Sequence, residues 1–213
     1  GPGNKYVTEA KRQCYGSVGI DFVAGPSEVL IIADETANSD YIAADVLAQC
    51  EHDYSARGIF ITTNKILGEE VCKKVDEILK DLPTREIASS SWRNNGEIIY
   101  VDNLDEAVKL SNKYAPEHLE VSLKNEDEII DKLINYGSLF LGGLSAEVFG
   151  DYVSGTNHTL PTLRASRYTG GVWVGTFIKT CTTQRLNQVA VNSLAPVAHD
   201  LAVEEGLYAH ANA

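Results

Sequence analysis

Apolar residues recur along the chain in short runs, and longer segments with helical spacing separate these runs. The runs are rich in β-branched residues, which is typical of buried strands. They are VLIIAD (29–34), GIFITT (58–63), EIIYVD (97–102), LEVSL (119–123) and SLFLGG (138–143). The segments between them predict helices over 39–52, 66–81, 104–114 and 125–136. This alternation indicates an α/β fold in which helices pack on a mostly parallel sheet.

Polar residues mark the ends of two of these predicted helices. Asn38 or Ser39 can cap the first helix. Asn125 begins the fourth, and the three acidic residues that follow it suit the positive end of a helix. Gly137 comes directly after the fourth pattern, where a C-terminal glycine is expected.

The pattern changes after about residue 143. The segment GDYVSGTNHTLPTLRASRYTGG (150–171) is polar and rich in Gly and Thr, and it has neither helical nor strand periodicity over a useful length. We predict a long loop here, and loops of this length in compact domains are usually functional or disordered. After VWVGTFIK, a helical pattern over about 187–210 predicts a small separate helical unit.

The chain opens on GPGNKYVTEAKRQCYG (1–16), which predicts a glycine turn followed by an amphipathic helix. Backbone N–H groups in such a turn can face an anion, although GPGN is not the G-x-G-x-x-G of a dinucleotide site. No strand precedes this helix, and the chain begins at Gly1 and contains no methionine. We therefore expect a processed or partial chain from which an upstream segment is missing.

Composition narrows the classes of function. The 213 residues carry a formal net charge of −12, which argues against a nucleic-acid partner because phosphate binding needs a clustered positive surface. No apolar run approaches the roughly 18 residues of a membrane span, and no basic-then-apolar leader opens the chain. We expect a soluble protein that acts on a small molecule. The widely spaced cysteines indicate reduced thiols of a cytoplasmic protein, or of an organelle stroma in a plant; they are Cys14, Cys50, Cys72 and Cys181.

One helical segment carries donors that could hold a metal. The pattern over 39–52 ends in AQCEH, where Gln49 and His52 are spaced i, i+3. That spacing puts an amide oxygen and an imidazole on one helix face, and such donors suit zinc or a similar divalent ion. A histidine in the last turn of a helix is also a favourable partner of the helix dipole, so a purely structural interpretation stays open.

Glu117 and His118 stand together in APEHLEV (115–121), at the start of a predicted strand. Pro116 biases the residue before it toward extended conformations, and adjacent side chains on an extended backbone point to opposite faces. The two side chains can therefore meet at one substrate only if the chain turns at this point. Otherwise either could be a solvated turn residue.

Further polar residues could contribute to a site, and each also has a structural interpretation. Asp151 and His158 lie in the predicted long loop. They could be a ligand and a substrate contact, or they could be loop-capping residues. Glu205 and His210 lie in EEGLYAHA, near the end of the chain. Ser27 in GPSEVL (25–30) sits at a tight turn, without the G-x-S-x-G surroundings of a nucleophile.

Taken in order, seven segments resemble the histidinol dehydrogenase family. They are GPGNKYVTEAK, DFVAGPSEVLIIAD, AADVLAQCEHD, APEHLEV, GSLFLG, GDYVSGTNHTLPT and EGLYAHANA. The resemblance covers nearly the whole chain and corresponds to roughly the C-terminal half of that enzyme. Members of the family are zinc-dependent homodimers that oxidise L-histidinol to L-histidine through the aldehyde, with two NAD+, in the last step of histidine biosynthesis.

The resemblance implies a role for each of the polar residues. His118 would be the general base that removes the substrate hydroxyl proton, and Glu117 would activate water to attack the aldehyde. The zinc ligands, which would also contact the substrate, would be Gln49, His52, Asp151 and His210, with His210 donated to the site of the other subunit. The further substrate contacts would be Ser27, His158 and Glu205, and the cofactor contact would be Asn4.

The resemblance also implies a domain organisation, with an incomplete Rossmann-like parallel sheet, flanking helices and a small C-terminal helical unit. Residues 1–26 would end a cofactor-side α/β domain, 27–172 would form part of the main catalytic α/β domain, and 173–213 would be a small dimerisation domain. Without the N-terminal half, the chain alone should not form a complete nicotinamide site. Two alternatives stay open: a paralogous zinc and NAD dehydrogenase of another polar alcohol, and a non-catalytic binding or assembly subunit.

Overall fold

The structure, a computed structural model, describes residues 5–213, and the chain divides into two compact units between Phe177 and Ile178. The strands of the first unit are β1 (Glu28–Ala33), β2 (Arg57–Thr62), β3 (Glu97–Tyr100), β4 (His118–Ser122) and β5 (Ser138–Leu141). Its α-helices are α1 (Lys5–Cys14), α2 (Ser39–Cys50), α3 (Lys65–Asp81), α4 (Arg85–Asn95), α5 (Leu104–Tyr114) and α6 (Glu147–Tyr152). Its 3₁₀ turns are η1 (Glu126–Glu128), η2 (Ile130–Lys132), η3 (Ala165–Arg167) and η4 (Val174–Phe177).

All five strands pair in parallel, in the order β3-β2-β1-β4-β5. The chain runs outward from β1 through β2 to β3 and then crosses back to place β4 on the other side of β1. His118 pairs with Val29 of β1 and with Ser138 of β5, so the amino ends of these three strands lie side by side. This order is that of a doubly wound, Rossmann-like sheet, and it confirms the predicted fold class.

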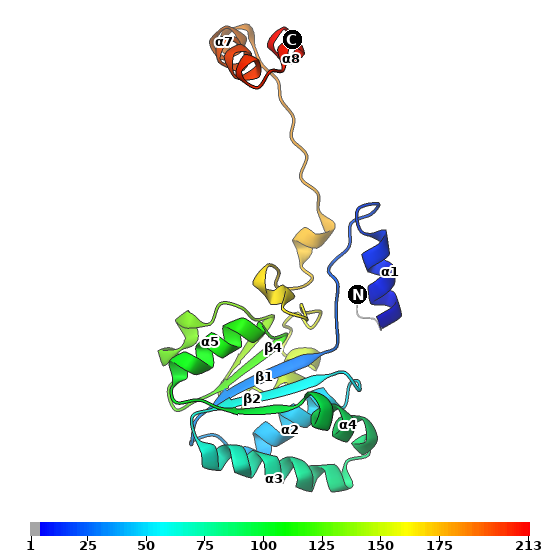
Figure 1. The fold of residues 1–213 in the computed structure, drawn as a ribbon, viewed down its shortest axis with the longest axis vertical. Coiled ribbons are helices and arrows are strands. Elements are labelled where there is room, and N and C mark those ends of the chain that lie inside the picture. The colour runs from blue at the N-terminus through cyan, green and yellow to red at the C-terminus, as the bar shows by residue number, and fades with distance from the viewer. Residues whose placement is uncertain (1–4) are drawn as a thin grey trace. The chain divides into compact units, whose positions relative to one another are not determined.

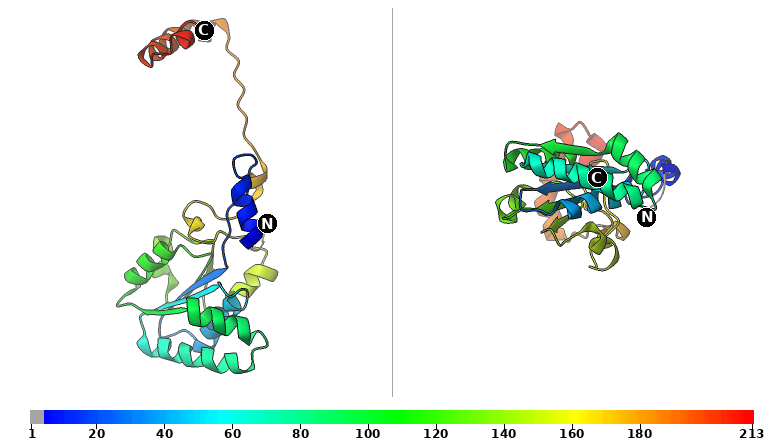
Figure 2. Two further views of the ribbon diagram at one scale, coloured as in Figure 1. Left: turned by 45° about the vertical axis from the view of Figure 1, so that its right-hand side comes forward. Right: turned by 90° about the horizontal axis from the view of Figure 1, so that it is seen from below.

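Helices cover both faces of the sheet (Figure 1). Helices α2, α3 and α4 lie on one face, which Figure 2 also shows from below, and α5 lies on the other. Val29 and Ile31 of β1 pack toward α2, whereas Leu30 and Ile32 pack toward α5. Because both faces of the central strand are buried, its sequence is continuously apolar and does not alternate.

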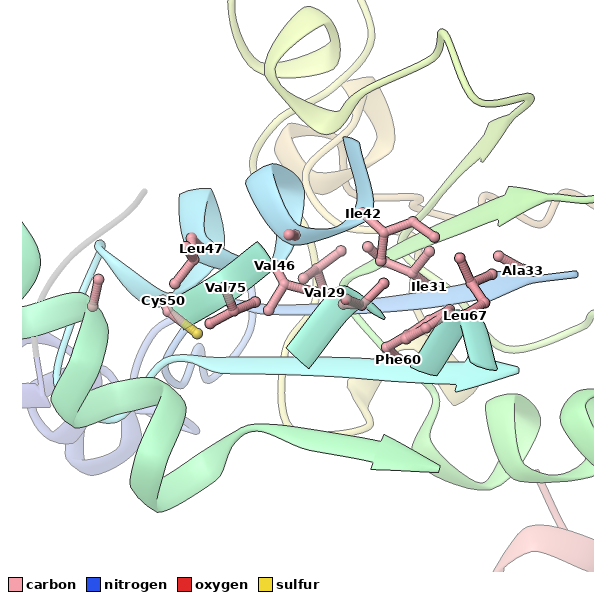
Figure 3. Close-up of a cluster of buried hydrophobic side chains, with 13 residues drawn as sticks. Val29, Ile31, Ala33, Ile42, Val46, Leu47, Cys50, Phe60, Leu67 and Val75 are labelled. Atoms are coloured by element: carbon pink, nitrogen blue, oxygen red, sulfur yellow. The ribbon is translucent and has the colours of Figure 1, made fainter. Parts of the chain in front are cut away.

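The core on the α2 face fixes the position of that helix close to the sheet (Figure 3). Val46 and Cys50 of α2 lie over Gly58 of β2, where an added Cβ would come within 2.7 Å of Val46 Cγ1. A glycine is therefore required on the strand for this close approach. The packing also fixes where the last turn of α2 ends, and this turn carries Gln49.

Three of the four helices predicted between the strands are present, and one prediction is wrong. Asn38 caps α2 as expected, because its side-chain oxygen accepts a hydrogen bond from the backbone N–H of Asp40 at 2.8 Å. The predicted helix over 125–136 forms only the 3₁₀ turns η1 and η2.

The side chain of Asn112 explains why this segment is not an α-helix. Its Nδ2 donates to the carbonyl of Lys132 at 2.8 Å, and its Oδ1 accepts from the backbone N–H of Ile134 at 2.9 Å. These bonds use peptide groups that a helix would need, and side-chain to backbone bonds of this kind compete with helix formation.

Gly137 has a different role from the one predicted. It follows no helix, and an added Cβ would lie 2.5 Å from the carbonyl oxygen of Glu117. Its own N–H donates to the carbonyl of Pro116 at 3.0 Å. Gly137 therefore lets the start of β5 approach the backbone beside Glu117.

Two helices were not predicted from the sequence. Helix α4 is strongly polar, and its buried residues are Ala88 and Ser91, so it lacks the apolar stripe that reveals an amphipathic helix. Helix α6 is a single short element whose end overlaps the start of the predicted loop at 150. The remainder of that loop contains one 3₁₀ turn, η3, among the described residues.

The second unit contains α7 (Gln188–Glu204) and α8 (Tyr208–Ala211), as the helical pattern over 187–210 predicted. Gly206 separates the two helices with a left-handed backbone at φ +73°, where glycine carries no steric penalty. The division of function among residues 1–26, 27–172 and 173–213 stays a prediction. Within the part of the chain that the structure describes, no helix is long and apolar enough to cross a membrane.

Candidate active site

A pocket of about 220 Å³ lies at the amino ends of β1 and β4. Its walls come from the residues before β1, the end of α2, the start of β4, helix α6 and the segment around 158–162. In open α/β sheets a ligand usually binds outside the carboxyl ends of the strands. This pocket lies at the opposite end of the strands, and the fold class alone would not predict that position.

Glu117 and His118 reach the same pocket because the chain turns just before β4. Ala115 follows α5 with a left-handed backbone at φ 51°, and Pro116 comes next. The carbonyl of Glu117 then accepts from the N–H of Ser138 at 2.9 Å, which ties the turn to β5. Both side chains line the pocket and are buried, with 6% and 3% exposure. Neither is therefore a solvated turn residue.

The Glu117 carboxyl group lies in surroundings that favour its neutral form. Its Oε2 accepts a hydrogen bond from the backbone N–H of Glu28 at 3.0 Å, which favours the carboxylate but is outweighed by burial. Burial raises the pKa of Glu117 to about 8, and the nearby carboxylates of Glu28 and Asp151 add to this rise. A cation bound beside Glu117 would have the opposite effect and favour the carboxylate.

The His118 imidazole is neutral near pH 7 and has one nitrogen without a partner. Burial lowers its pKa to about 4, so its contacts with Glu117 Oε2 at 3.8 Å and Glu147 Oε1 at 3.4 Å are not ion pairs. Its Nδ1 lies 3.2 Å from the carbonyl oxygen of Glu28, an acceptor that favours a proton on Nδ1. This tautomer leaves the lone pair on Nε2, which is buried and has no hydrogen-bond partner among the described residues.

Gln49 and Glu147 form a buried pair beside this histidine. Gln49 is fully buried on α2, and Glu147 is 6% exposed at the start of α6. With its Nε2 toward Glu147, Gln49 donates to Oε2 at 2.8 Å and to Oε1 at 3.0 Å, and the same nitrogen lies 3.1 Å from His118 Nδ1. Because the Nδ1 proton is directed at the carbonyl of Glu28, Nδ1 accepts no hydrogen bond from Gln49, and the N–H groups of Gln49 are left for Glu147. The reverse orientation would set an amide oxygen against a carboxylate, two acceptors in contact, so this orientation is assigned.

Three side chains around the pocket form a group that could hold a metal ion. One donor atom each from His52, Glu147 and Asp151 lies within 4.8 Å of the other two. Imidazole and carboxylate donors suit zinc. Burial raises the pKa values of both carboxyl groups, and for Glu147 the nearby Glu120 carboxyl adds to the rise. A divalent cation would compensate for this clustering of acids.

The structure brings most of the predicted site residues of the first unit into this one pocket. In addition to Glu117 and His118, the pocket is lined by Ser27, Gln49, His52, Asp151 and His158. Glu205 is the C-cap residue of α7, and His210 lies on α8, so both belong to the second unit. Asn4 lies outside the described residues.

Glu147 is the ionisable pocket residue that the sequence pattern does not reveal. It lies four residues before Asp151, and this spacing puts two carboxylates on one face of a helix. The sequence pattern does not show this pair, because it predicts no helix over α6 and the predicted loop begins at Gly150. Recognising α6 would have added Glu147 to the candidate ligands.

We expect the metal-free protein to be more stable at pH 6.5 than at pH 8, and Glu117→Gln to remove part of this difference. The folded-state pKa of Glu117 is about 8, above its ordinary value of 4.5. Its stabilising contribution is complete below about pH 4.5 and is lost as the pH rises toward 8. Between pH 6.5 and 8 the loss is about 1–2 kcal/mol.

Urea unfolding with a chelator present, at several pH values in this range, measures the effect. Over this range His118 adds a smaller slope of the opposite sign, about 0.4 kcal/mol, because its ordinary pKa of 6.5 leaves the unfolded chain partly protonated at pH 6.5 whereas its folded-state pKa is about 4. An unchanged pH slope in Glu117→Gln would contradict the raised pKa.

Comparisons with known proteins agree with the family that the motifs suggest. The family model for histidinol dehydrogenase matches residues 1–213. A protein named histidinol dehydrogenase homolog from Shouchella clausii is 48% identical over 210 residues, covering 99% of this chain and 50% of the relative. The histidinol dehydrogenase of Rhizobium meliloti is 48% identical over 211 residues, covering 99% of this chain and 49% of that enzyme.

A solved structure gives the same result. The crystal structure of histidinol dehydrogenase from Elizabethkingia anophelis superposes with a TM-score of 0.89 and 42% identity, covering 100% of this chain and 49% of that chain. The chain thus spans about half the length of the curated relatives it matches. A match over all of these residues, in sequence and in fold, shows that the chain belongs to the histidinol dehydrogenase family.

Proposed function

We propose that the protein oxidises L-histidinol to L-histidine through the aldehyde, using two NAD+ and zinc, and that this chain supplies the acid–base and metal-binding residues. The observation that carries this proposal is the pocket at the amino ends of β1 and β4. It combines a neutral histidine that has a free nitrogen, a buried carboxyl group and a cluster of metal-binding donors. In a four-electron oxidation of an alcohol, the histidine can act as a base, the carboxyl group can activate water, and a metal ion can orient the substrate.

His118 is the base of the alcohol oxidation in this proposal. Its Nδ1–H is held by the carbonyl of Glu28, so Nε2 has the lone pair that accepts the substrate hydroxyl proton. The carbinol carbon then loses a hydride to NAD+, and the aldehyde forms. Because the imidazole is neutral near pH 7, it is in the correct protonation state to act.

Glu117 acts in the second oxidation. In its carboxylate form it accepts a proton from water as the water oxygen bonds to the aldehyde carbon, and the hydrate so formed loses a second hydride to another NAD+. Balanced over both steps, histidinol, one water and two NAD+ give the histidine carboxylate, two NADH and three protons. The substrate ammonium or a bound cation would favour the carboxylate form of Glu117 that this step requires.

The residues of the pocket fit a zinc ion. Gln49, His52 and Asp151 would hold it, and His210 would complete the set from the other subunit of a homodimer. The clustered donors of His52, Glu147 and Asp151 support this assignment. When bound, zinc would hold and orient the substrate and act as a Lewis acid.

The substrate and cofactor contacts complete the proposal. Ser27 and His158 line the pocket, where they could meet the polar groups of histidinol. Glu205 would contribute a further substrate contact. The NAD+ assignment rests on family membership, because its one proposed contact, Asn4, lies outside the described residues.

The experiment that tests this proposal is the NADH yield of the protein at its natural length, hereafter the source-length protein, with L-histidinol and zinc. We expect about two NADH for each histidinol consumed, and histidine as the product. A yield of one NADH with accumulation of aldehyde would contradict the role of Glu117. Faster turnover of another polar alcohol would indicate the paralogous enzyme, and zinc binding without turnover of any alcohol would indicate a non-catalytic subunit.

A further inference from the structure

We propose that Glu147 is a positioning residue of the metal centre, whose carboxylate fixes the side-chain amide of Gln49 so that Oε1 is presented to the cation. The inference deepens the proposed function and rests on the zinc site described there. It assigns a role to the one acidic group of the pocket that this mechanism leaves without one.

The contacts of Gln49 carry the argument. An amide can bind a cation only through its oxygen, yet its two ends are almost equal in size, so packing alone does not select the orientation. Both oxygens of Glu147 lie within hydrogen-bond distance of Gln49 Nε2, at 2.8 and 3.0 Å. The carboxylate therefore accepts from Nε2 and turns Oε1 away from itself.

Burial makes this selection strong. Gln49 has no exposed surface, so water cannot replace the carboxylate as the acceptor of its N–H groups. Reversing the amide would let Oε1 accept from His118 Nδ1 at 3.1 Å, but it would leave the N–H groups without the carboxylate acceptor and would set Oε1 against both carboxylate oxygens. Unpaired buried polar groups are costly, and when a bound cation holds Glu147 in its carboxylate form, the hydrogen bonds from Gln49 are charge-assisted and stronger than neutral ones.

Glu147 is itself held in place by the fold. Its backbone N–H donates to Glu120 Oε1 at 3.1 Å, which ties the first residue of α6 to β4. Helix α6 also packs closely on β5, since a Cβ at Gly150 would lie 2.6 Å from Phe140 Cε1. Asp151 follows one turn later, so the same helix supplies both a proposed ligand and the group that orients another.

The geometry alone also allows Glu147 to be a direct ligand, because its oxygen belongs to the group with His52 and Asp151. A double-mutant cycle separates the two roles. A residue that acts through Gln49 loses its effect once Gln49 is removed, whereas a direct ligand keeps its effect.

The experiment measures zinc affinity of the source-length protein by competition with a chromophoric chelator. The variants are Glu147→Ala, Glu147→Gln, Gln49→Ala and Gln49→Ala with Glu147→Ala. We expect Glu147→Ala to weaken zinc binding about 10- to 100-fold, as is typical when the partner of a ligand is removed. Glu147→Gln, which keeps an oxygen acceptor for Nε2, should recover part of this loss. In the Gln49→Ala background, Glu147→Ala should have almost no further effect.

Asp40→Asn is a matched control, because Asp40 is an exposed acid on α2 that pairs with Lys74 Nζ at 3.0 Å and does not line the pocket. It should leave zinc affinity unchanged within about twofold. Far-UV circular dichroism and the urea midpoint confirm that each variant is folded.

Two results would overturn the proposal. The first is unchanged zinc affinity in folded Glu147→Ala. The second is an equal loss from Glu147→Ala with and without Gln49, which would identify a direct ligand. Failure of the unsubstituted protein to bind zinc would instead contradict the zinc site of the proposed function, so the two failures are distinguishable.

Discussion

His118→Asn should lower turnover of L-histidinol by about 100- to 10,000-fold while zinc stays bound. The loss follows from the removal of Nε2, the buried nitrogen that accepts the hydroxyl proton in the proposed mechanism and that has no hydrogen-bond partner in residues 5–213. Asparagine can still donate an N–H toward the carbonyl of Glu28, so the local structure should survive. Zinc should be retained because His118 is not among the proposed ligands.

The measurement is steady-state NADH production together with the metal content of the purified source-length variant. The pH profile adds a second test, because a base that acts in the first oxidation should shape the acidic limb of the profile. His199→Asn is a matched control, since His199 is exposed on α7 and has no assigned role. Loss of zinc from His118→Asn, or turnover within a few-fold of the unsubstituted protein, would contradict the assignment.

His52→Ala should weaken zinc binding by more than about 100-fold, a larger effect than removal of an outer partner of a ligand. His52 supplies the imidazole of the donor group and lies two residues after the end of α2. Its side chain is exposed, so its removal leaves no buried cavity and the fold should persist. The expected loss therefore reports on the metal and not on unfolding.

Chelator competition measures this affinity, and excess zinc should partly restore turnover in the variant. Asp53→Asn is the control, because Asp53 is the next residue, is exposed and accepts a local hydrogen bond from the N–H of Ser55 at 2.8 Å. Zinc affinity in His52→Ala equal to that of Asp53→Asn would remove His52 from the ligand set.

The amino-acid sequence by itself determined the class of fold. The strands β1, β2 and β4 are central and buried on both faces, so they appear in the sequence as continuous apolar runs with clear ends. The helices α2, α3 and α5 have either a strong apolar face or a clear cap. The order of the motifs also identified the family, because each motif retains the residue types that its chemistry needs.

Long-range contacts decided what the sequence could not. The segment 125–136 has a helical pattern, but the amide of Asn112, distant in the sequence, takes its peptide hydrogen bonds. Gly137 is the residue type expected at a helix end. In the structure it instead allows the start of β5 to approach the backbone of Glu117.

The tertiary structure also decided how the site is assembled. Alternation on a strand would separate Glu117 from His118, and the left-handed Ala115 with the turn after it brings both into one pocket. Glu147 joins Gln49 only because α6 is packed on the edge of the sheet. Local patterns in the sequence show which residues are apolar and how they repeat. Whether polar groups from separate elements meet depends on how those elements pack, and no local pattern contains that information.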